Sequence, residues 1–489
     1  MTESAAYADK LISALANWLA QTAPTDPPAE VCPASEEDAV DGVRPQIVVR
    51  PRRIEHIAAA VRFSGMHRLS IVPVGGRTQT HWGGAADGAD VLLDLSCMNR
   101  VLDYQPADMT ITVEAGCPLR ELQARLAEHR QFLPVDPPLP PRATAGGIVA
   151  TNACGPLRFG YGTVRDYLLG ARFVRANGDI VQVGGRVVKN AAGFELAKLL
   201  TGSLGTLGIL AELTFMVRPR PEQARLLFIP LPRLEAVEPL IATLLDATLE
   251  PVLLELANEA ALLRFPAGLL PADMPAPYGI FVGFMGSRTA VSWQVEYARS
   301  LVASLPAPPG NVLRGVELPW RPAYDALLEA RRAGAEALVC RASLLSSDVA
   351  AFLDRAEELF RDLEHSVPVW AHAGTGIVHL YFDPVPAGAP ELVARLGALV
   401  GEASAAIPPA RSVSVDDGTP SILEAPGTGD LELLRSLVSA NLVIESAPAE
   451  LRRHLPVWGR RAAHHDLSER LKRRLDPDGL LNPGRLLGG

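Results

Sequence analysis

Apolar positions repeat with a helical period near the N-terminus and with shorter, strand-like periods beyond it. Residues 5–19 place Leu11, Leu15 and Leu19 on one helical face, which predicts a short amphipathic helix. From residue 45 to the run ELTFMVRP at 212, short β-branched runs alternate with short helical runs, and glycine, proline or Asn-Gly turns separate them. This alternation predicts an α+β domain built from many small strands.

Longer runs of both kinds follow between residues 222 and 445. Pieces such as YGIFVGFM and AVEPLIATLLDATL predict an antiparallel sheet with helices on one face. The last stretch is helical in pattern until DPDGLLNPGR, whose Asp-Pro and Asn-Pro steps impose turns. We therefore expect four parts, which are an N-terminal helix with a proline-rich linker (1–38), the α+β domain (39–221), a second domain (222–445) and a C-terminal helical segment (446–489).

Composition and charge narrow the class of protein. A chain of 489 residues is too long for one ordinary core, so two or three domains are expected. A formal charge of −9 without a basic run argues against a nucleic-acid partner. No apolar run is long enough to span a bilayer, and the N-terminal apolar segment contains Asp9 and Lys10. We therefore expect a cytoplasmic protein with no membrane span of its own.

The cysteines are scattered and include no C-x-x-C pair. The five of them stand at positions 32, 97, 117, 154 and 340. This spacing excludes a disulfide framework and an iron–sulfur cluster held by this chain alone. It suits a reducing compartment.

Three glycines recur at a spacing of three in TGSLGTLG, at Gly202, Gly205 and Gly208. The stretch lacks the G-x-G-x-x-G order of a Rossmann fingerprint, and the chain contains no P-loop. Alone, it favours a structural helix-to-strand turn. Three further glycine-rich loops, at 72–84, 134–155 and 158–166, point instead to one extended ligand held by backbone N–H groups.

The loops resemble a known family. The stretches IEHIAAAVRFSGMHRLSIVPVGGRT, ATAGGIVATNACG, YGTVRDYLLGARFVRANGDIV and GSLGTLGIL are similar to the FAD-binding domain of the PCMH type, also called the vanillyl-alcohol oxidase type. LKRRLDPDGLLNPGR resembles the closing segment of its 2-hydroxy-acid oxidase branch. Within that branch, RFGYGTVRD, GGRVVKNAAGFELAKLLTGSLGTLG and LVIESAPAELRRHLPVWG are most similar to the FAD-binding E subunits of bacterial glycolate oxidases. The resemblance implies an α+β FAD-binding domain of two subdomains and an antiparallel-sheet cap that binds substrate.

The same resemblance implies a set of FAD-binding residues. The pyrophosphate loop falls on Gly75, Gly76, Arg77, Thr78 and Gln79. The loops beside the flavin and its ribityl chain fall on Pro137, Thr144, Gly146, Gly147, Thr151, Asn152, Gly155, Tyr161 and Gly162, together with Asn482 from the closing segment. Gly202, Gly205, Gly208 and Ile209 fall at the adenosine end.

Arg77 marks a departure from the family pattern. It stands where the family usually has a third glycine, and it could pair with a phosphate. Relatives that bind flavin covalently often have a histidine directly after the paired glycines, which is the position of Arg77. We therefore expect non-covalent FAD, and we expect the nearby His81 to be structural.

The substrate side rests on WAHAGTGIVHLYF, which places His372 and His379 seven positions apart. The stretch resembles the HxGDGNLH motif, whose histidines bind a divalent metal such as Zn or Mn in D-lactate and D-2-hydroxyglutarate dehydrogenases. The alternative is two histidines with satisfied hydrogen bonds at a domain interface. Arg331 matches an arginine of the branch that is associated with the substrate carboxylate, and the alternative is an exposed helix arginine.

The metal motif is incomplete in this chain. Thr375 replaces its aspartate, and SVDDG aligns with the family's SGEHG. Asp416 then stands in place of a metal-binding glutamate, as a third ligand beside the two histidines. Asp417 stands in place of a catalytic histidine, where it would be a poor base unless burial raised its pKa.

Three functions remain open. The leading hypothesis is an FAD-binding subunit of a glycolate (2-hydroxy acid) oxidase complex, in which His372, His379, Arg331 and Asp416 serve catalysis. Its partners would be a second FAD subunit and an iron–sulfur subunit, through which it could be held at the inner membrane. The second hypothesis is an autonomous FAD-dependent dehydrogenase for a D-2-hydroxy acid. The third is a non-catalytic scaffold without flavin.

Overall fold

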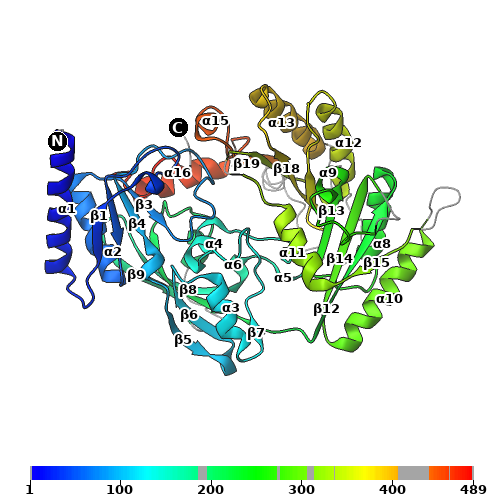
Figure 1. Ribbon diagram of the computed structural model, residues 1–489, viewed down its shortest axis with the longest axis horizontal. Helices are drawn as coiled ribbons and strands as arrows, with labels where there is room; N and C mark the ends of the chain where they lie inside the picture. The colour runs from blue at the N-terminus through cyan, green and yellow to red at the C-terminus, as the bar shows by residue number, and fades with distance from the viewer. Residues whose placement is uncertain are drawn as a thin grey trace, which may run out of the picture.

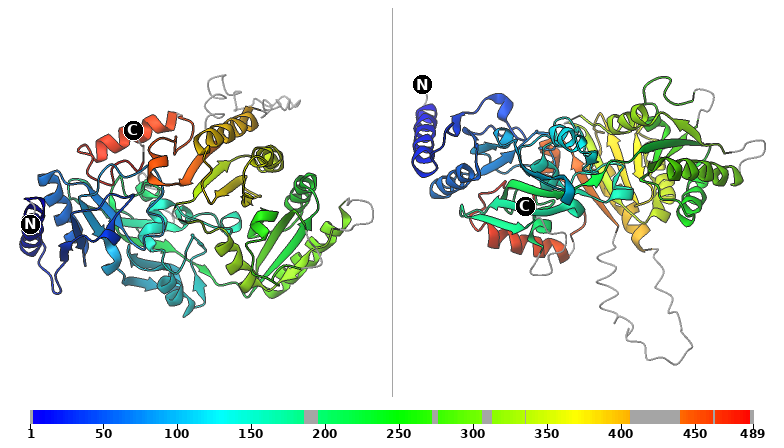
Figure 2. Two further views of the ribbon diagram at one scale, coloured as in Figure 1. Left: turned by 45° about the horizontal axis from the view of Figure 1, so that its top comes forward. Right: turned by 90° about the horizontal axis from the view of Figure 1, so that it is seen from below.

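The molecule is elongated, with two unequal parts side by side (Figure 1). The computed structural model describes residues 3–185, 195–271, 276–305, 313–334, 336–405, 440–461 and 463–486. The N-terminal helix lies at one end of the long axis, and the eight-stranded sheet with its helices, which we call the cap, lies at the other (Figure 2). Among the described helices, none is long and apolar enough to cross a membrane.

The N-terminal half contains two main sheets. The first has the order β1 (Glu30–Pro33), β2 (Ile47–Arg50), β4 (Val91–Asp94) and β3 (Ile71–Val74), with β2, β4 and β3 parallel. The second, antiparallel sheet has the order β5 (Val101–Gln105), β6 (Thr110–Glu114), β10 (Ile209–Met216), β8 (Leu168–Val174) and β9 (Ile180–Gly184). A small ribbon pairs β7 (Gln131–Phe132) with β11 (Arg218–Pro219).

Helices cover these sheets and connect their strands. They are α1 (Glu3–Thr22), α2 (Ile54–His67), α3 (Leu119–Ala127), α4 (Ala145–Thr151), α5 (Arg158–Tyr161), α6 (Val164–Tyr167) and α7 (Leu196–Leu200). The amphipathic helix expected over residues 5–19 is α1, whose Leu11, Leu15 and Leu19 are buried in a core shared with α2. The Trp18 indole N–H also donates to the Ala59 carbonyl at 2.9 Å, which fixes α1 on α2.

The cap sheet is antiparallel throughout, as the sequence predicts. Its order is β15 (Val316–Leu318), β12 (Gln223–Leu231), β14 (Tyr278–Gly286), β13 (Leu253–Asn258), β17 (Val369–His372), β18 (Ile377–Phe382), β16 (Leu338–Ser343) and β19 (Asn441–Ser446). One face packs on α8 (Val237–Asp246), α10 (Arg288–Ser304), α12 (Val349–Phe360) and α13 (Ala389–Ala405). The other face packs on α11 (Trp320–Ala330) and α9 (Glu259–Leu262).

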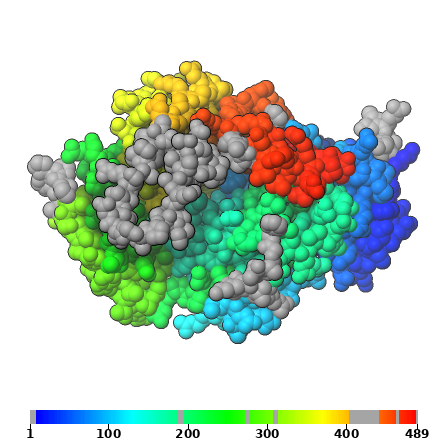
Figure 3. Space-filling view, turned by 180° about the vertical axis from the view of Figure 1, so that it is seen from behind, coloured from blue at the N-terminus to red at the C-terminus, as the bar shows by residue number. Residues whose placement is uncertain are grey.

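The C-terminal segment returns to the N-terminal half. After β19 the chain forms α15 (Ala449–Arg452) and α16 (Ala463–Leu475), and α16 lies against the N-terminal half in Figures 1 and 3. The Asp476 carboxylate accepts hydrogen bonds from the Leu480 and Leu481 N–H groups at 3.0 and 2.8 Å. This forms the turn that the Asp-Pro step predicts, and it sets Leu481 beside Ile71 of β3 in a parallel bridge.

Candidate functional site

Four loops that the sequence predicts for FAD come together in the N-terminal half. The Gly202 and Leu204 N–H groups donate to the Val149 and Ala150 carbonyls at 2.9 and 2.8 Å. The Asn482 side-chain N–H donates to the Leu204 carbonyl at 2.6 Å. The 75–79 loop lies directly against the 142–144 segment. Loops far apart in sequence therefore form one continuous backbone surface.

The glycines in these loops serve two purposes. A Cβ on Gly76 would lie 1.7 Å from the Arg142 carbonyl oxygen, and a Cβ on Gly208 would lie 2.6 Å from the Phe173 ring. Gly146 and Gly155 are equally close to Ala115 and Asp136. Chain packing alone accounts for the absence of a side chain at these positions. At Gly147 a Cβ would meet one atom outside its own helix backbone, the Thr144 hydroxyl at 3.1 Å, so packing restricts a side chain less here than at the other four positions.

Three side-chain amides give a test of whether a polar ligand fits here. Gln79 Nε2, Asn152 Oδ1 and Asn482 Oδ1 are buried, and none has a hydrogen-bond partner among the described residues. Buried polar atoms are normally satisfied, and these three come from three of the converging loops. Arg77, Asn152 and Asn482 also adopt left-handed backbone with φ of 54°, 51° and 42°, a conformation common in anion-binding loops. The residues present fit FAD.

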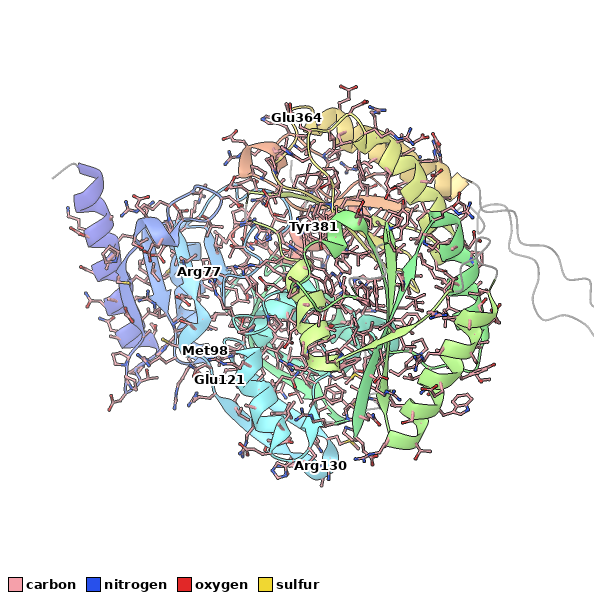
Figure 4. All side chains as sticks on the ribbon, turned by 45° about the vertical axis from the view of Figure 1, so that its right-hand side comes forward. Arg77, Met98, Glu121, Arg130, Glu364 and Tyr381 are labelled. Atoms are coloured by element: carbon pink, nitrogen blue, oxygen red, sulfur yellow. The ribbon has the colours of Figure 1, made fainter. Side chains whose placement is uncertain are left out.

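The Arg77 side chain is held by protein groups of the N-terminal half, and burial affects the nearby His81. One Arg77 guanidinium nitrogen is 2.8 Å from the Asp38 carboxylate, and another donates to the Glu37 carbonyl at 2.9 Å. Figure 4 shows Arg77 in the N-terminal half, apart from Tyr381 in the cap. Burial, aided by Arg452, lowers the pKa of His81 to about 4. The phosphate contact proposed for Arg77 stays a prediction.

The remaining predicted FAD residues lie along the same loops. The Thr144 hydroxyl caps α4 by accepting from the Gly147 N–H at 3.3 Å, and the Thr151 hydroxyl donates to the Gly147 carbonyl at 2.8 Å. Ile209 is fully buried at the start of β10. Tyr161 packs edge-on against Phe132, at the end of α5 where Gly162 turns the chain with a φ of 80°.

Charged side chains gather on the α11-facing side of the cap sheet. In β13, Leu254 and Leu256 enter the core under α8 and α10, so the intervening Glu255 points to the opposite face. Glu255 is in register with His372, while His379 pairs with Arg341 across β18 and β16. Side chains directly opposite in an antiparallel pair share a face. These residues and Glu445 of β19 form what we call the cap cluster.

The His372 ring lies between the Glu255 carboxyl group and the Arg331 guanidinium. Its Nδ1 is 2.6 Å from the Glu255 carboxylate, and its Nε2 is 2.8 Å from an Arg331 guanidinium nitrogen. Because a guanidinium only donates, Nε2 accepts and the proton of the neutral ring lies on Nδ1. Burial, with Arg331, lowers the pKa of His372, which keeps the ring neutral. Burial raises the pKa of Glu255 to about 8, although Arg331 acts against this rise.

Arg331 is buried, which excludes the exposed-helix alternative. Its side chain is 10% exposed, and its guanidinium is 3.3 Å from the Glu255 carboxylate. The residue follows the last turn of α11 as its C-cap. The structure therefore brings Arg331 and the two predicted histidines together.

His379 pairs with the second acid of the cap cluster. Its Nε2 is 3.3 Å from the Glu445 carboxylate, which is also 3.3 Å from the Arg341 guanidinium. Burial alone would raise the pKa of Glu445, but His379 and Arg341 hold it at about 2. Burial lowers the pKa of His379. An ionised Glu445 only accepts, which places the proton of the neutral ring on Nε2 and leaves the lone pair on Nδ1. Nδ1 is buried and has no hydrogen-bond partner among the described residues.

The described part of the chain offers no complete metal site. It contains no group of three or more His, Cys, Asp or Glu side chains arranged to hold a metal ion. Both ring nitrogens of His372 face protein groups, and a guanidinium occupies the direction in which Nε2 would bind a metal. Asp416 and Asp417 lie outside the described residues. As placed here, His372 offers no free nitrogen to a metal, and the metal role predicted for His379 and Asp416 stays a prediction.

Sequence reasoning missed Glu255, Glu445 and Arg341. Each is a single charged residue in an otherwise apolar strand, in LLELAN, LVIES and LVCRAS. A buried charge in such a strand is unfavourable unless it is paired. A single charged residue within an apolar strand was therefore the sequence signal for a buried polar site. The partners could not be read from the sequence, because strand order alone brings them together.

Arg158, on α5, was also missed. Its helix contacts the cap, where the Gly160 N–H donates to the Val252 carbonyl at 3.1 Å. Burial dominates the pKa values of Glu255 and His372, and the charge of Arg158 adds a smaller lowering effect on both. Among the described residues, its guanidinium has no hydrogen-bond or ion-pair partner. Arg158 is therefore an available cation beside the cap cluster.

Comparison with known proteins places both parts of the chain. A family model described as "FAD binding domain" matches residues 45–184, and one described as "FAD linked oxidases, C-terminal domain" matches residues 220–407. The first match includes the 75–79 loop and the segment around α4, which supports FAD as the ligand of those loops. The four expected chain divisions stay predictions.

Individual relatives extend these matches. A D-lactate dehydrogenase from Anaerostipes hadrus is 30% identical over 360 residues, which cover 71% of this chain and 75% of that protein. Glycolate oxidase subunit GlcE from Escherichia coli (strain K12) is 42% identical over 130 residues, 26% of this chain and 37% of that protein. The solved structure of p-cresol methylhydroxylase with substrate bound matches with a TM-score of 0.65 at 15% identity, covering 97% of this chain and 96% of that one. This likeness confirms the predicted PCMH-type α+β fold.

Proposed function

The chain belongs to the FAD-linked oxidases that join a PCMH-type FAD-binding domain to a C-terminal cap, and from this premise we propose that it oxidises a 2-hydroxy acid to the 2-oxo acid. FAD, when bound, supplies the acceptor for the hydride that leaves the substrate carbon. The relatives named above include a D-lactate dehydrogenase and a glycolate oxidase subunit, which supports this substrate class.

The observation that carries the proposal is the placement of the cap cluster. Its two acids, two histidines and one arginine lie on the sheet face turned toward α11 and α5, whereas the opposite face is apolar under four helices. Phe159 of α5 packs against Gly374 in the β17–β18 turn. A polar reaction site thus borders the half that holds the FAD loops.

Two requirements of the reaction are met by groups of this chain. The substrate carboxylate needs a cation, and the Arg158 guanidinium has no hydrogen-bond or ion-pair partner within the described part of the chain. The hydroxyl proton needs an acceptor, and His379 Nδ1 has a free lone pair. Glu445 orients the ring through Nε2, as a carboxylate does for a general base. Arg331 holds His372 and Glu255 in place.

The finer proposal is a subunit of a glycolate oxidase-like complex. The similarity to GlcE supports it, and the scattered free cysteines support a need for an external iron–sulfur partner. The competing hypothesis, an autonomous D-2-hydroxy-acid dehydrogenase, is supported by the longer alignment with D-lactate dehydrogenase. The flavin is proposed to be non-covalent, because Arg77 stands in the position of the covalent histidine.

The test is an anaerobic titration of the purified full chain. A yellow protein whose flavin absorption is bleached by glycolate, D-lactate or D-2-hydroxyglutarate supports the proposal, and the most effective acid identifies the substrate. Release of all flavin into the supernatant after acid precipitation supports the non-covalent mode. A colourless protein that takes up no added FAD would instead favour the scaffold.

A further inference from the structure

Asp136 is a fully buried carboxylate on the segment that leads to the flavin loops. Its Oδ1 accepts from the Gly155 N–H at 2.9 Å, and its Oδ2 accepts from the Leu157 N–H at 2.9 Å. The next residue, Pro137, is predicted to lie beside the flavin. The carboxylate therefore ties together the two ends of a cofactor loop.

A third donor to Asp136 comes from the cap. The Tyr324 hydroxyl donates to Oδ2 at 2.6 Å, across 188 positions of sequence. Tyr324 lies on α11, stacked against Trp320 and packed in the apolar core that contains Phe281 and Trp370. Burial and the Asp136 charge raise the pKa of Tyr324 well above its usual value, so the phenol keeps its proton and remains a donor.

The same helix ends at the cap cluster. Arg331 follows α11 seven positions after Tyr324, which is about two helical turns, or roughly 10 Å along the axis. Arg331 contacts Glu255 and His372. One rigid element thus has the Asp136 hydrogen bond near its middle and the reaction-site arginine at its end.

We propose that Tyr324 and Asp136 are positioning residues, which fix α11, and with it Arg331 and the cap cluster, relative to the flavin loop. This inference rests on the proposed function, because it concerns the geometry between the cluster and the flavin. Catalysis depends steeply on such geometry, and a misplacement of about 1 Å can cost about a hundredfold in rate. A hydrogen bond from a phenol to a buried carboxylate suits this purpose, because it is directional and protected from water.

The experiment compares Tyr324→Phe with a matched control. Tyr278→Phe removes the same hydroxyl from a second tyrosine–carboxylate pair, Tyr278 to Glu357 at 2.5 Å, which joins β14 to α12 within the cap. Each purified full-length variant is assayed for bound FAD, for thermal unfolding, and for the change in flavin absorption on titration with oxalate. Oxalate is a dicarboxylate probe that carries no oxidisable hydroxyl.

We expect Tyr324→Phe to retain FAD and to unfold within a few degrees of the Tyr278→Phe control. Its Kd for oxalate should rise about tenfold, with a smaller limiting change in the flavin spectrum, while Tyr278→Phe keeps the wild-type Kd. A merely structural hydroxyl would move the unfolding temperature of both variants and the Kd of neither. Equal oxalate affinity in Tyr324→Phe and wild type would overturn the proposal.

Two further outcomes separate this inference from the proposed function. If oxalate perturbs the flavin but no 2-hydroxy acid bleaches it, the proposed reaction fails, and the oxalate comparison still decides the role of Tyr324. A wild-type flavin spectrum that oxalate leaves unchanged would count against the inference itself, because the cap would then bring no carboxylate site to the flavin.

Discussion

Two arginines near the cap cluster differ in whether their guanidinium groups have protein partners. Arg331 is committed to Glu255 and His372, whereas Arg158 has no partner among the described residues. Removing Arg331 leaves the Glu255 carboxyl and His372 Nε2 buried without the donor that they share, and a buried polar group without a partner costs about 1–3 kcal/mol. Removing the half-buried Arg158 breaks no such contact among the described residues.

We therefore predict that Arg331→Gln and Arg158→Gln separate stability from substrate binding. Arg331→Gln should lower the unfolding temperature clearly and weaken carboxylate binding with it. Arg158→Gln should unfold within a few degrees of wild type and still raise the Kd for oxalate about tenfold or more, as expected for the loss of one charge-assisted contact. Thermal unfolding and the flavin titration measure both effects. An unchanged oxalate Kd in Arg158→Gln would leave Arg331 as the carboxylate residue.

The role of proton acceptor that we propose for His379 predicts how the bleaching rate depends on pH. Burial lowers the pKa of His379, while Glu445 acts to raise it. The ring is therefore neutral above about pH 6.5, and flavin bleaching should lose rate only below that pH. Glu445→Gln removes the charge that favours the imidazolium, so the acidic limb should move to still lower pH. The plateau should fall about a hundredfold, because the ring loses its orientation.

The measurement is the single-turnover bleaching rate as a function of pH, with Glu357→Gln in the distant pair as control. A limb that moves to higher pH in Glu445→Gln, or that does not move, would argue against His379 as the base.

Single residues were predictable from the sequence only where a motif spans a few positions. His372 and His379 belong to one hairpin, so their proximity follows from local spacing. The metal predicted for them also needs a distant third ligand, Asp416, which lies outside the described residues. The partners that the structure shows for the two histidines are Arg331, Glu255 and Glu445. These come from a helix and two strands that only the sheet order brings together.

At the scale of elements, the glycines of the predicted FAD loops are of two kinds. At some, a Cβ would collide with the chain, whereas at Gly147 it would meet only one side-chain atom. Gly147→Leu should lose most bound FAD, to about a tenth of the wild-type content or less, because the added side chain would extend past the Thr144 hydroxyl, the one atom near its Cβ, into the proposed flavin site. The unfolding temperature of the flavin-free protein should change little. Gly76→Val is a poorer test, because its Cβ would collide with the Arg142 carbonyl and disturb the loop itself.

Gly401→Leu provides the control for the same substitution. Nothing lies within 4 Å of a Cβ at Gly401 on α13, so this variant should bind FAD as wild type does. Retention of the flavin by Gly147→Leu, measured from the absorption ratio of the purified proteins, would show that α4 does not border the cofactor.

Secondary structure followed the pattern of apolar positions closely. The helix–turn–strand expected around TGSLGTLG is α7, a glycine turn and β10, and the antiparallel cap sheet forms as its alternating runs predict. What the pattern lacks is pairing information. The β13–β17 and β16–β19 contacts join strands separated by long segments, and these contacts decide which charges share the cap cluster.

Over the whole molecule, a buried ion cluster joins three distant segments. Arg452 of α15 and Arg485 of the closing segment both pair with Asp41, which precedes the first parallel strand. The two arginines also donate to the Gly84 carbonyl at 3.1 Å. The sequence shows only isolated charges at these places, because such a cluster exists only when both halves have folded against each other. It fixes β19, and hence Glu445, beside the glycine loops.

The arrangement of the whole chain also leads to a prediction about how electrons would leave the reduced flavin. With Arg158 as the proposed carboxylate residue and His379 as the proposed base, the isolated, FAD-loaded chain should bleach once with its substrate under anaerobic conditions. Sustained reduction of a soluble quinone should be slow, because the free cysteines at 32, 97, 117, 154 and 340 hold no iron–sulfur cluster to pass single electrons onward.

Co-expression with a second flavin subunit and an iron–sulfur subunit should therefore raise quinone reduction at least tenfold over the isolated chain. The informative control is the same complex carrying His379→Gln, because the second flavin subunit could perform the oxidation itself. Loss of activity in that complex assigns the oxidation to this chain, since the mutation removes the proposed base while the other subunits are intact. Full activity would make this chain a scaffold for its partners, and full quinone turnover by the isolated chain would make it an autonomous dehydrogenase.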